Sequence, residues 1–219
     1  MELRHQLFLQ ARIAAYMGVS RATVSRVLRR AGLSRLGDLQ PKEPVQRYER
    51  ETPGELLHID IKKLGRFDRT GHRITGEQTQ CSRSIGGEFL FVAIDDHSWI
   101  AFTQMHPDER KESAVSFVQA ATEHFTKLGV TIERVITDNG SAFRSHAFRI
   151  ACGALGIRQK FTRAYRPQTN GKAERFIQSA LREWAYGHAY ANSDQRRAAL
   201  PLWNHFYNWH RPHHGIGCQ

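Results

Sequence analysis

The sequence predicts an α/β protein in which a mixed five-stranded sheet is flanked by helices and preceded by a small all-α unit. From residue 56 onward, short apolar runs of strand length alternate with segments in which apolar residues recur every three or four positions. Before residue 33 the pattern is helical and basic throughout. The order of three strands, helix, strand, helix, strand and helix is typical of an α/β layer architecture with a mixed sheet.

Composition divides the 219-residue chain into three parts. Residues 1–32 form the helical, basic segment. Residues 33–55 hold three prolines among alternating charges and few large apolar residues, which is typical of a linker. Residues 56–219 then contain the strands and helices of the main domain, with a helix and a tail at the C-terminal end.

The charge balance favours a polyanionic partner. Lysine and arginine number 32 against 21 aspartates and glutamates, a formal net charge of +11. Nucleic acid is the commonest partner of such a surplus, and a merely soluble basic protein is the alternative. The three cysteines are widely spaced without a C-x-x-C pair, which argues against a disulfide framework or zinc site and favours a reduced, cytoplasmic setting. No apolar run is long enough to span a membrane.

Residues 11–32 have the pattern of a helix-turn-helix. Ala14 is small where two helices cross, Gly18 permits a tight turn, and the Ser20 hydroxyl is placed to cap the second helix. Because few residues precede this segment, we expect a unit that is truncated at its start. The alternative is a short amphipathic hairpin with a solvated basic face.

The second helix of this segment is predicted to bind DNA. Val24, Val27 and Leu28 form its expected buried stripe. An arginine-bearing helix after a tight turn is what a reader of the DNA major groove needs. The predicted DNA contacts of this helix are Arg21, Arg26, Arg29 and Arg30.

The strands of the main domain follow from alternation and from short apolar runs. In residues 56–64, Leu57, Ile59 and Ile61 share one face and Asp60 lies on the other. The next run, 89–95, is continuously apolar, as in a central strand covered on both faces, and we expect it to form a hairpin with the strand after it. The other predicted strands are 99–105, 133–137 and 157–161, and the predicted helices are 113–128, 145–155 and two that start near Asn170 and Asp194.

Three acidic residues stand out by their places in these elements. Asp60 lies in the middle of the first strand, Asp138 directly follows the fourth strand, and Glu174 lies in the first turns of a later helix. On a helical wheel Glu174 falls roughly 20° beyond Leu181, at the border of that helix's apolar stripe. It is therefore expected to point towards the margin of the sheet, where acids from strand ends can meet it.

A cluster of these acids would need a cation. Three ionised carboxylates repel one another by roughly 4 kcal/mol for each close pair at an effective dielectric constant near 20. Hard oxygen ligands suit Mg²⁺ or Mn²⁺, and two such ions about 3.5–4 Å apart can assist displacement at a phosphodiester. Taken one at a time, the acids also have structural explanations: an edge-strand residue, a turn former and a helix-start acid.

Five segments of the chain together carry a family resemblance. They are LLHIDIKKL with Asp60, FVAIDDHS, VITDNGSAF with Asp138, YRPQTNGKAERF with Glu174, and FYNWHRPHHGIG. Thirty-five residues separate the second acid from the third. This combination, which extends over nearly the whole chain, resembles the DDE transposases of bacterial insertion sequences, whose integrase catalytic core is shared with retroviral integrases.

The resemblance implies a ribonuclease-H-like core that performs metal-dependent DNA cleavage at insertion-sequence ends and joins the freed 3′-hydroxyl to target DNA. It makes Asp60, Asp138 and Glu174 the catalytic metal ligands, with two Mg²⁺ or Mn²⁺ ions as cofactors. It also implies double-stranded DNA (terminal repeats and target) as the partner, a homo-multimer on that DNA, and a place at the nucleoid of the bacterial cytoplasm. The further DNA contacts that it implies are Tyr165, Arg166, Gln168, Asn170, Lys172 and Arg175.

Two other functions fit the same residues. A catalytically inactive, truncated copy would bind element ends and repress transposition, and a nuclease on the same fold would hydrolyse DNA without joining it. Asp95 and Asp96 are interpreted as residues that end a strand and satisfy turn amides. Surface packing or DNA contact is the interpretation of a histidine group near the C-terminus, His205, His210, His213 and His214.

Overall fold

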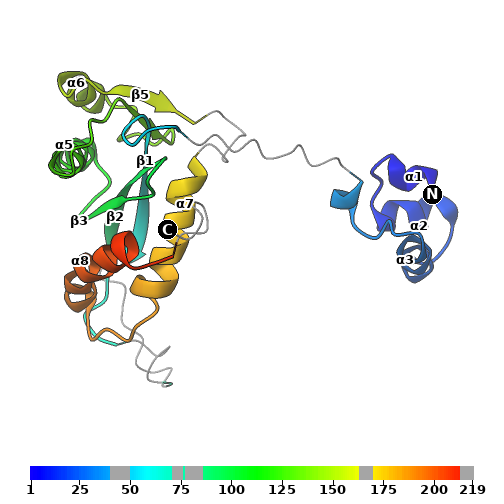
Figure 1. Ribbon diagram of the computed structural model, residues 1–219. Helices are drawn as coiled ribbons and strands as arrows, with labels where there is room; N and C mark the ends of the chain where they lie inside the picture. The colour runs from blue at the N-terminus through cyan, green and yellow to red at the C-terminus, as the bar shows by residue number, and fades with distance from the viewer. Residues whose placement is uncertain (40–49, 71–75, 77–85, 163–169, 213–219) are drawn as a thin grey trace. The chain divides into compact units, whose positions relative to one another are not determined.

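The computed structural model describes residues 1–39, 50–70, 76, 86–162 and 170–212 (Figure 1). The chain divides into two compact units, Met1–Tyr48 and Glu49–Gln219. Within these described ranges, no helix combines the length and the apolar character that crossing a membrane requires.

The N-terminal unit contains α1 (Glu2–His5), α2 (Gln10–Met17), α3 (Arg21–Arg30) and a short 3-10 turn, η1 (Leu36–Asp38). Gly18 ends α2 in the left-handed conformation, with φ of 65°. The Ser20 hydroxyl accepts a hydrogen bond of 3.1 Å from the backbone N–H of Thr23, in the first turn of α3. The turn and the cap that the sequence predicts are therefore confirmed.

A small apolar core holds the helices of this unit together. Ile13 and Ala14 of α2 are buried with Val24 and Leu28 of α3. Val27, which was expected in the same buried stripe, is 50% exposed, so that prediction is wrong. Val24 and Leu28 are one turn apart and share the buried face, whereas Val27 lies about 100° from Leu28 around the helix axis.

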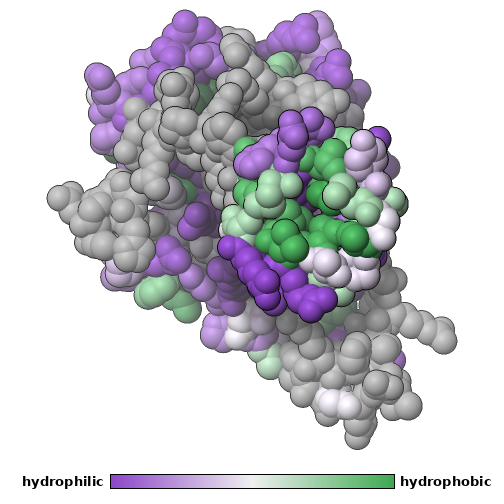
Figure 2. Space-filling view, turned by 90° about the vertical axis from the view of Figure 1, so that its right-hand side faces the viewer, coloured by the Kyte–Doolittle hydropathy of each residue, from purple (hydrophilic) through white to green (hydrophobic). Residues whose placement is uncertain are grey.

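Apolar side chains also lie on the surface of the N-terminal unit. Leu9, Tyr16 and Met17 are exposed, in addition to Val27. Figure 2 shows hydrophobic residues, in green, next to hydrophilic residues, in purple. Arg4, in contrast, is a charged residue that is buried. Its guanidinium donates hydrogen bonds to the backbone carbonyls of Phe8, Leu33 and Ser34. These hydrogen bonds compensate for the burial of its charge.

The core of the second unit is a mixed five-stranded sheet (Figure 1). Its strands are β1 (Leu57–Gly65), β2 (Gly87–Asp95), β3 (Ala101–His106), β4 (Arg134–Thr137) and β5 (Arg158–Phe161). They lie in the order β3-β2-β1-β4-β5. The first three pair antiparallel, whereas β4 is parallel to both β1 and β5. The five strands and the β2–β3 hairpin confirm the fold predicted from the sequence.

Helices cover both faces of this sheet. One face packs against α5 (Lys111–Lys127) and α6 (His146–Ala154). The other packs against α7 (Gly171–Ala180), which continues into a π-helical segment, η4 (Leu181–Ala185), and against α8 (Ser193–Trp209). Along β2, alternate residues enter the two apolar clusters, so this strand is covered on both faces, as its apolar run predicted.

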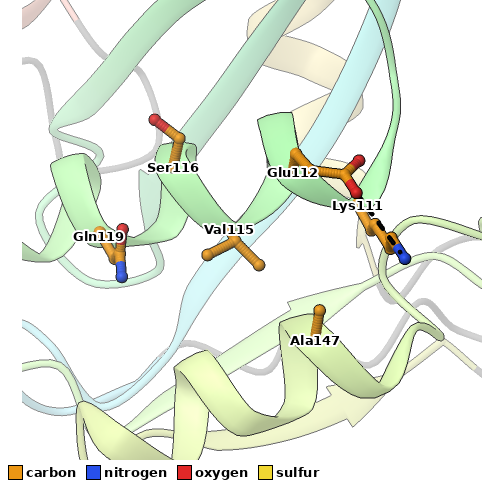
Figure 3. Close-up of a pocket in the computed structure, with 6 residues that line it drawn as sticks. All are labelled: Lys111, Glu112, Val115, Ser116, Gln119 and Ala147. Atoms are coloured by element: carbon orange, nitrogen blue, oxygen red, sulfur yellow. Dashed lines mark ion pairs between the residues drawn. The ribbon is translucent and has the colours of Figure 1, made fainter.

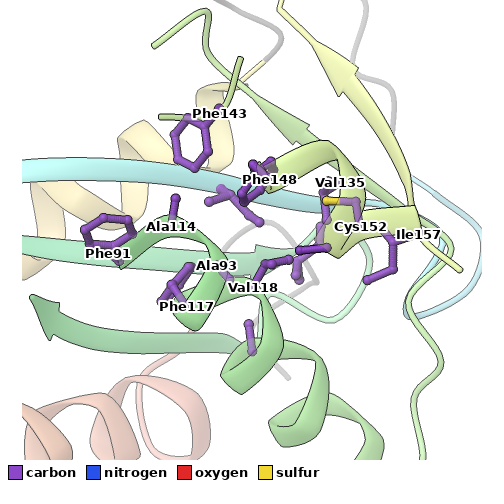
Figure 4. Packing of buried hydrophobic residues seen from close by; sticks show 14 of the residues in the cluster. Phe91, Ala93, Ala114, Phe117, Val118, Val135, Phe143, Phe148, Cys152 and Ile157 are labelled. Atoms are coloured by element: carbon purple, nitrogen blue, oxygen red, sulfur yellow. The ribbon is translucent and has the colours of Figure 1, made fainter. Parts of the chain in front are cut away.

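The two clusters differ in what accompanies their apolar side chains. In the cluster under α5 and α6, Phe91, Phe117 and Phe148 pack among small and branched residues (Figure 4). On the α7 and α8 face, a buried ion pair also joins α8 to β2: Arg196 Nη2 lies 2.5 Å from Glu88 Oε1. The same guanidinium donates to a backbone carbonyl at the end of β1, which satisfies more of its hydrogen-bonding capacity.

Candidate active site

Asp60 projects from the middle of β1 towards the face of the sheet that α7 covers. Its neighbour Ile59 is buried in the cluster on the opposite face, and its cross-strand partner Val92 is buried in the cluster beside α7. Its Oδ1 accepts a hydrogen bond of 2.8 Å from the backbone N–H of Ile61. Alternation along β1 therefore places this carboxylate where the sequence predicts it.

Asp138 lies in the turn that directly follows β4, and its side chain is exposed. Its Oδ1 accepts a hydrogen bond of 2.9 Å from the backbone N–H of Gly140. A Cβ atom on residue 140 would lie 2.9 Å from that same oxygen, so a glycine at this position leaves room for the carboxylate. Asn139 closes the turn on its other side by donating to the backbone carbonyl of Thr162 at 3.1 Å.

Glu174 lies at the fourth residue of α7 and is exposed. Ala173, Phe176 and Ile177 bury the adjoining stripe of this helix against the sheet. Glu174 therefore stands at the margin between the apolar stripe and solvent, as the helical wheel predicts.

Asp60 interacts electrostatically with each of the other two acids. Burial raises the pKa of Asp60 to about 6, and the negative charges of Asp138 and Glu174 contribute to this rise. Since such interactions weaken with distance, the carboxylates of β1, of the turn after β4 and of α7 share one region of the molecule. Among the residues that the structure describes, no group of three or more His, Cys, Asp or Glu side chains is arranged to hold a metal ion as it stands.

The predicted DNA contacts fall into three sets. The four arginines of α3 (Arg21, Arg26, Arg29 and Arg30) are all exposed, as is Arg175 beside Glu174 on α7. Tyr165, Arg166 and Gln168 lie outside the described residues. Asn170 and Lys172 point into the protein instead. Asn170 is 3% exposed, and the Lys172 side chain is 15% exposed and pairs with Asp96.

A buried polar group beside the acids was not anticipated from the sequence. His58 lies two residues before Asp60 on the same face of β1, and its ring contacts Asp96 and Asn170. Strand alternation places His58 on the face of Asp60, opposite the apolar row, so the sequence pattern gave no signal that this side chain is buried. Asp95 does accept from turn amides, those of Gly54 and Ser98, as expected.

A surface hollow of about 350 Å³ lies away from these residues, between α5 and α6 (Figure 3). Its lining comes from one side of α5, with Val115 at the centre, and from Ala147 of α6. The ion pair between Lys111 and Glu112 at its edge spans 3.7 Å between exposed side chains. None of the three acids lines it.

Comparison of the chain with known families agrees with this arrangement of the sheet. Residues 50–167 match the model of the integrase core domain, and residues 155–219 match a second model of the same description. The chain belongs to the integrase core domain family. Its mixed sheet with helices on both faces is the ribonuclease-H-like fold of integrases.

Several curated proteins are similar to this integrase core domain. A putative integrase of Spiroplasma virus SpV1-C74 is 25% identical over 144 residues, which cover 60% of this chain and 40% of that protein. A putative transposase InsD for insertion element IS2E of Escherichia coli is 34% identical over 85 residues, or 37% of this chain and 38% of that protein. This chain therefore spans less than half the length of these relatives.

A solved structure shares the fold of this integrase core domain. It is a cryo-EM structure of the simian T-cell lymphotropic virus intasome in complex with a regulatory subunit of PP2A. The two chains superpose with a TM-score of 0.51 and 19% sequence identity, over 88% of this chain and 67% of the other. At this level of identity the likeness concerns the fold alone.

Proposed function

We propose that this chain is a transposase that cleaves DNA at the ends of an insertion sequence and transfers the cleaved strand to target DNA. The observation that carries the proposal is the electrostatic coupling of Asp60 to Asp138 and Glu174. The three acids come from separate elements of an integrase core, and the charges of Asp138 and Glu174 act on the Asp60 carboxyl on the central strand. Similarity to an insertion-element transposase adds support.

The chemistry of these side chains suits divalent cations. Three carboxylates offer hard oxygen ligands, for which Mg²⁺ and Mn²⁺ are the natural partners. Burial raises the pKa of Asp60 and repulsion from Asp138 and Glu174 adds to that rise; a bound cation would offset both effects. Because the described acids are not arranged as a finished ligand set, we expect them to draw together when ions bind. Two bound ions would activate the attacking oxygen and stabilise the leaving one.

Each acid is held by the protein in a different way. Asp60 is carried by a central strand, and Asp138 is restrained by the backbone N–H of Gly140. Glu174 is carried by the first turns of a helix that is packed on the sheet. In this proposal, the reaction needs no nucleophilic side chain, since the protein positions the phosphodiester and stabilises its charge.

Basic side chains would hold the DNA. The four exposed arginines of α3 suit the major groove of a terminal repeat. Arg175, next to Glu174, suits a phosphate near the cleaved bond. We propose the same role for Tyr165, Arg166 and Gln168, which lie outside the described residues. Double-stranded DNA bound by a homo-multimer is the proposed assembly.

A strand-transfer assay tests this function. Labelled element ends are incubated with target DNA and Mg²⁺ or Mn²⁺, and the wild type is compared with Asp138→Asn, which keeps the side-chain shape but removes the charge. We expect joined product from the wild type and a loss of about 10²–10³-fold in the variant. Equal product from both would refute the carboxylate mechanism. Binding without cleavage would indicate a repressor, and hydrolysis without joining a nuclease.

A further inference from the structure

The buried side chain of His58 connects three elements around the acids. Its ring is on β1 and the residue is 4% exposed. Nε2 lies 2.9 Å from Oδ1 of Asp96, which follows β2, and Nδ1 lies 3.2 Å from Oδ1 of Asn170, which precedes α7. A single residue thus links two strands of the sheet to the start of the helix that carries Glu174.

Asn170 uses its side chain in an unusual way for its position. It occupies the N-cap position of α7, where an asparagine commonly accepts a hydrogen bond from its own helix. Here it makes no such capping bond. Its Oδ1 faces His58 and its Nδ2 donates to the backbone carbonyl of Ile59 at 3.1 Å. The amide therefore fastens the start of the helix to β1 at two points.

Lys172 and Asp96 add a second link between α7 and the sheet. Lys172 Nζ lies 3.2 Å from Asp96 Oδ1 and also donates to the backbone carbonyl of Asp96. It sits 4.7 Å from the centre of the Trp99 ring, a residue held at φ of 62°. A bulky residue in the left-handed region persists where its surroundings hold it firmly. Asp96 is further held by the backbone N–H of Arg50, at 2.7 Å.

The contacts of His58 and Asn170 lie close to two of the three acids, Asp60 and Glu174. His58 precedes Asp60 by two strand residues, about 7 Å along β1. Asn170 precedes Glu174 by four helical residues, about 6 Å along α7. The His58–Asn170 hydrogen bond therefore crosses from strand to helix roughly one helical turn away from the two carboxylates. It opposes the separation that their repulsion favours.

We propose that His58 and Asn170 are positioning residues, which hold the first turn of α7 on β1 so that Glu174 stays within reach of Asp60. The inference rests on the proposed function, because it assigns these residues to the same carboxylate site. Neither side chain reaches solvent enough to contact DNA. Their effect on the reaction is transmitted through the two acids.

The experiment compares His58→Leu, His58→Gln and Asn170→Ala in the full chain. Mn²⁺ binding is measured by titration calorimetry without DNA, and strand transfer is measured separately at saturating DNA. We expect the leucine and alanine variants to bind Mn²⁺ about 10–100-fold more weakly and to lose turnover by a similar factor. We expect DNA affinity within about 2-fold of the wild type, since the site of substitution is buried. The glutamine variant, which can still donate to one partner, should lie between leucine and wild type.

A matched control separates positioning from general destabilisation. Arg196→Met removes a buried hydrogen-bonding side chain on the same face of the sheet, at the Glu88 contact rather than at His58. It should lower the melting temperature and leave Mn²⁺ affinity unchanged. If His58→Leu does not fold, His58→Gln and Asn170→Ala provide the comparison.

The outcomes distinguish the inference from the function on which it rests. Wild-type Mn²⁺ affinity in His58→Leu and Asn170→Ala, together with its loss in Asp138→Asn, would overturn the positioning role and leave the carboxylate site intact. Equal Mn²⁺ affinity and equal joined product in the wild type and Asp138→Asn would instead overturn the proposed function. If Arg196→Met lost as much Mn²⁺ affinity as His58→Leu, the loss in His58→Leu would be explained by general destabilisation, and the positioning role would be overturned.

Discussion

The two faces of the central sheet are packed in different ways. Under α5 and α6, aromatic and branched side chains fill the space between sheet and helices (Figure 4). Under α7 and α8, apolar packing is combined with buried charged and polar groups: the Glu88–Arg196 ion pair near one end and the His58–Asp96–Asn170 contacts near the other. The acids of the candidate site lie beside the second of these polar groups.

The two faces of the sheet therefore have different roles. Apolar contacts are not directional and stabilise the fold in proportion to buried area. Buried hydrogen bonds to charged groups are directional, and they specify how one element is oriented on another. The face of the sheet that positions the carboxylates thus contains directional contacts. Substitutions on the two faces should therefore differ in their effects on stability and on Mn²⁺ affinity.

Phe117→Ala should have the largest effect on stability. The ring is fully buried on the apolar face, 5.3 Å from the Phe91 ring and 5.7 Å from the Phe102 ring. Its truncation leaves a cavity and should lower the free energy of unfolding by about 3–5 kcal/mol in urea titrations. Gln119→Ala, exposed on the same helix, is the control, with a change below about 0.5 kcal/mol. If folded Phe117→Ala bound Mn²⁺ more weakly than the wild type, the apolar face would also position the acids, and the proposed difference between the two faces would be wrong.

Arg196→Met should cost about 3 kcal/mol of unfolding free energy, because it leaves Glu88 buried without its closest partner. The loss should fall at the low end of the usual range for such changes, since Arg197 remains 3.2 Å from Glu88. Replacing both members of the pair with Met and Leu should recover much of the loss. Arg197→Met, at a half-exposed side chain, should cost less than about 1 kcal/mol. Equal losses in the two single variants would contradict the burial argument.

Asp96 should make stability depend on pH. Burial raises the pKa of its carboxyl, but hydrogen bonds from His58 and from the Arg50 backbone N–H, with the charge of Lys172, outweigh burial and hold the pKa at about 2 instead of 3.8. Because the folded-state pKa is depressed, a contribution of about 2 kcal/mol is present above about pH 4 and is lost as the pH falls towards 2.

The comparison with Asp96→Asn isolates that contribution, since asparagine does not titrate. The difference in unfolding free energy between wild type and variant, measured from pH 6 to pH 2, should shrink through this window. A difference that stays constant with pH would show that the carboxylate contacts contribute no net charge stabilisation.

Ser20→Ala should have the smallest effect, about 1 kcal/mol on α3, because the Thr23 N–H loses its capping partner. Hydrogen exchange at the amides of α3 measures the loss within the N-terminal unit, while exchange in the sheet stays at its wild-type rate. Ser20→Asn retains a capping oxygen and should protect α3 nearly as well as serine. Equal protection in the alanine variant would mean that the cap is dispensable here.

Local patterns in the sequence anticipated most of the architecture. The strand over 89–95 and the helix over 113–128 appear as Gly87–Asp95 and Lys111–Lys127. The wheel position of Glu174 at the border of an apolar stripe is also observed. Val27 shows the limit of this reasoning: a wheel identifies a broad apolar side, but the width that is buried depends on the partner helix.

The polar contacts around the acids could not be predicted from local sequence patterns. Asn170 and Lys172 were predicted as DNA contacts because of the segment in which they occur, and the structure turns both inwards. His58 and Asn170 are 112 residues apart along the chain, and His58 and Asp96 are 38 residues apart. Hydrogen bonds between such distant residues leave no periodic signature that a single sequence could display.

The amino-acid sequence by itself determined the elements, the turn and cap of the N-terminal unit, and which face of β1 presents Asp60. These features depend on neighbours within about four residues, through strand and helix periods and through capping. Tertiary structure alone decided that Asp60 interacts with Asp138 and Glu174, and that a histidine and an asparagine fasten α7 to β1. Those relations depend on how strands and helices from distant parts of the chain pack, because side-chain contacts at that range form in the folded state.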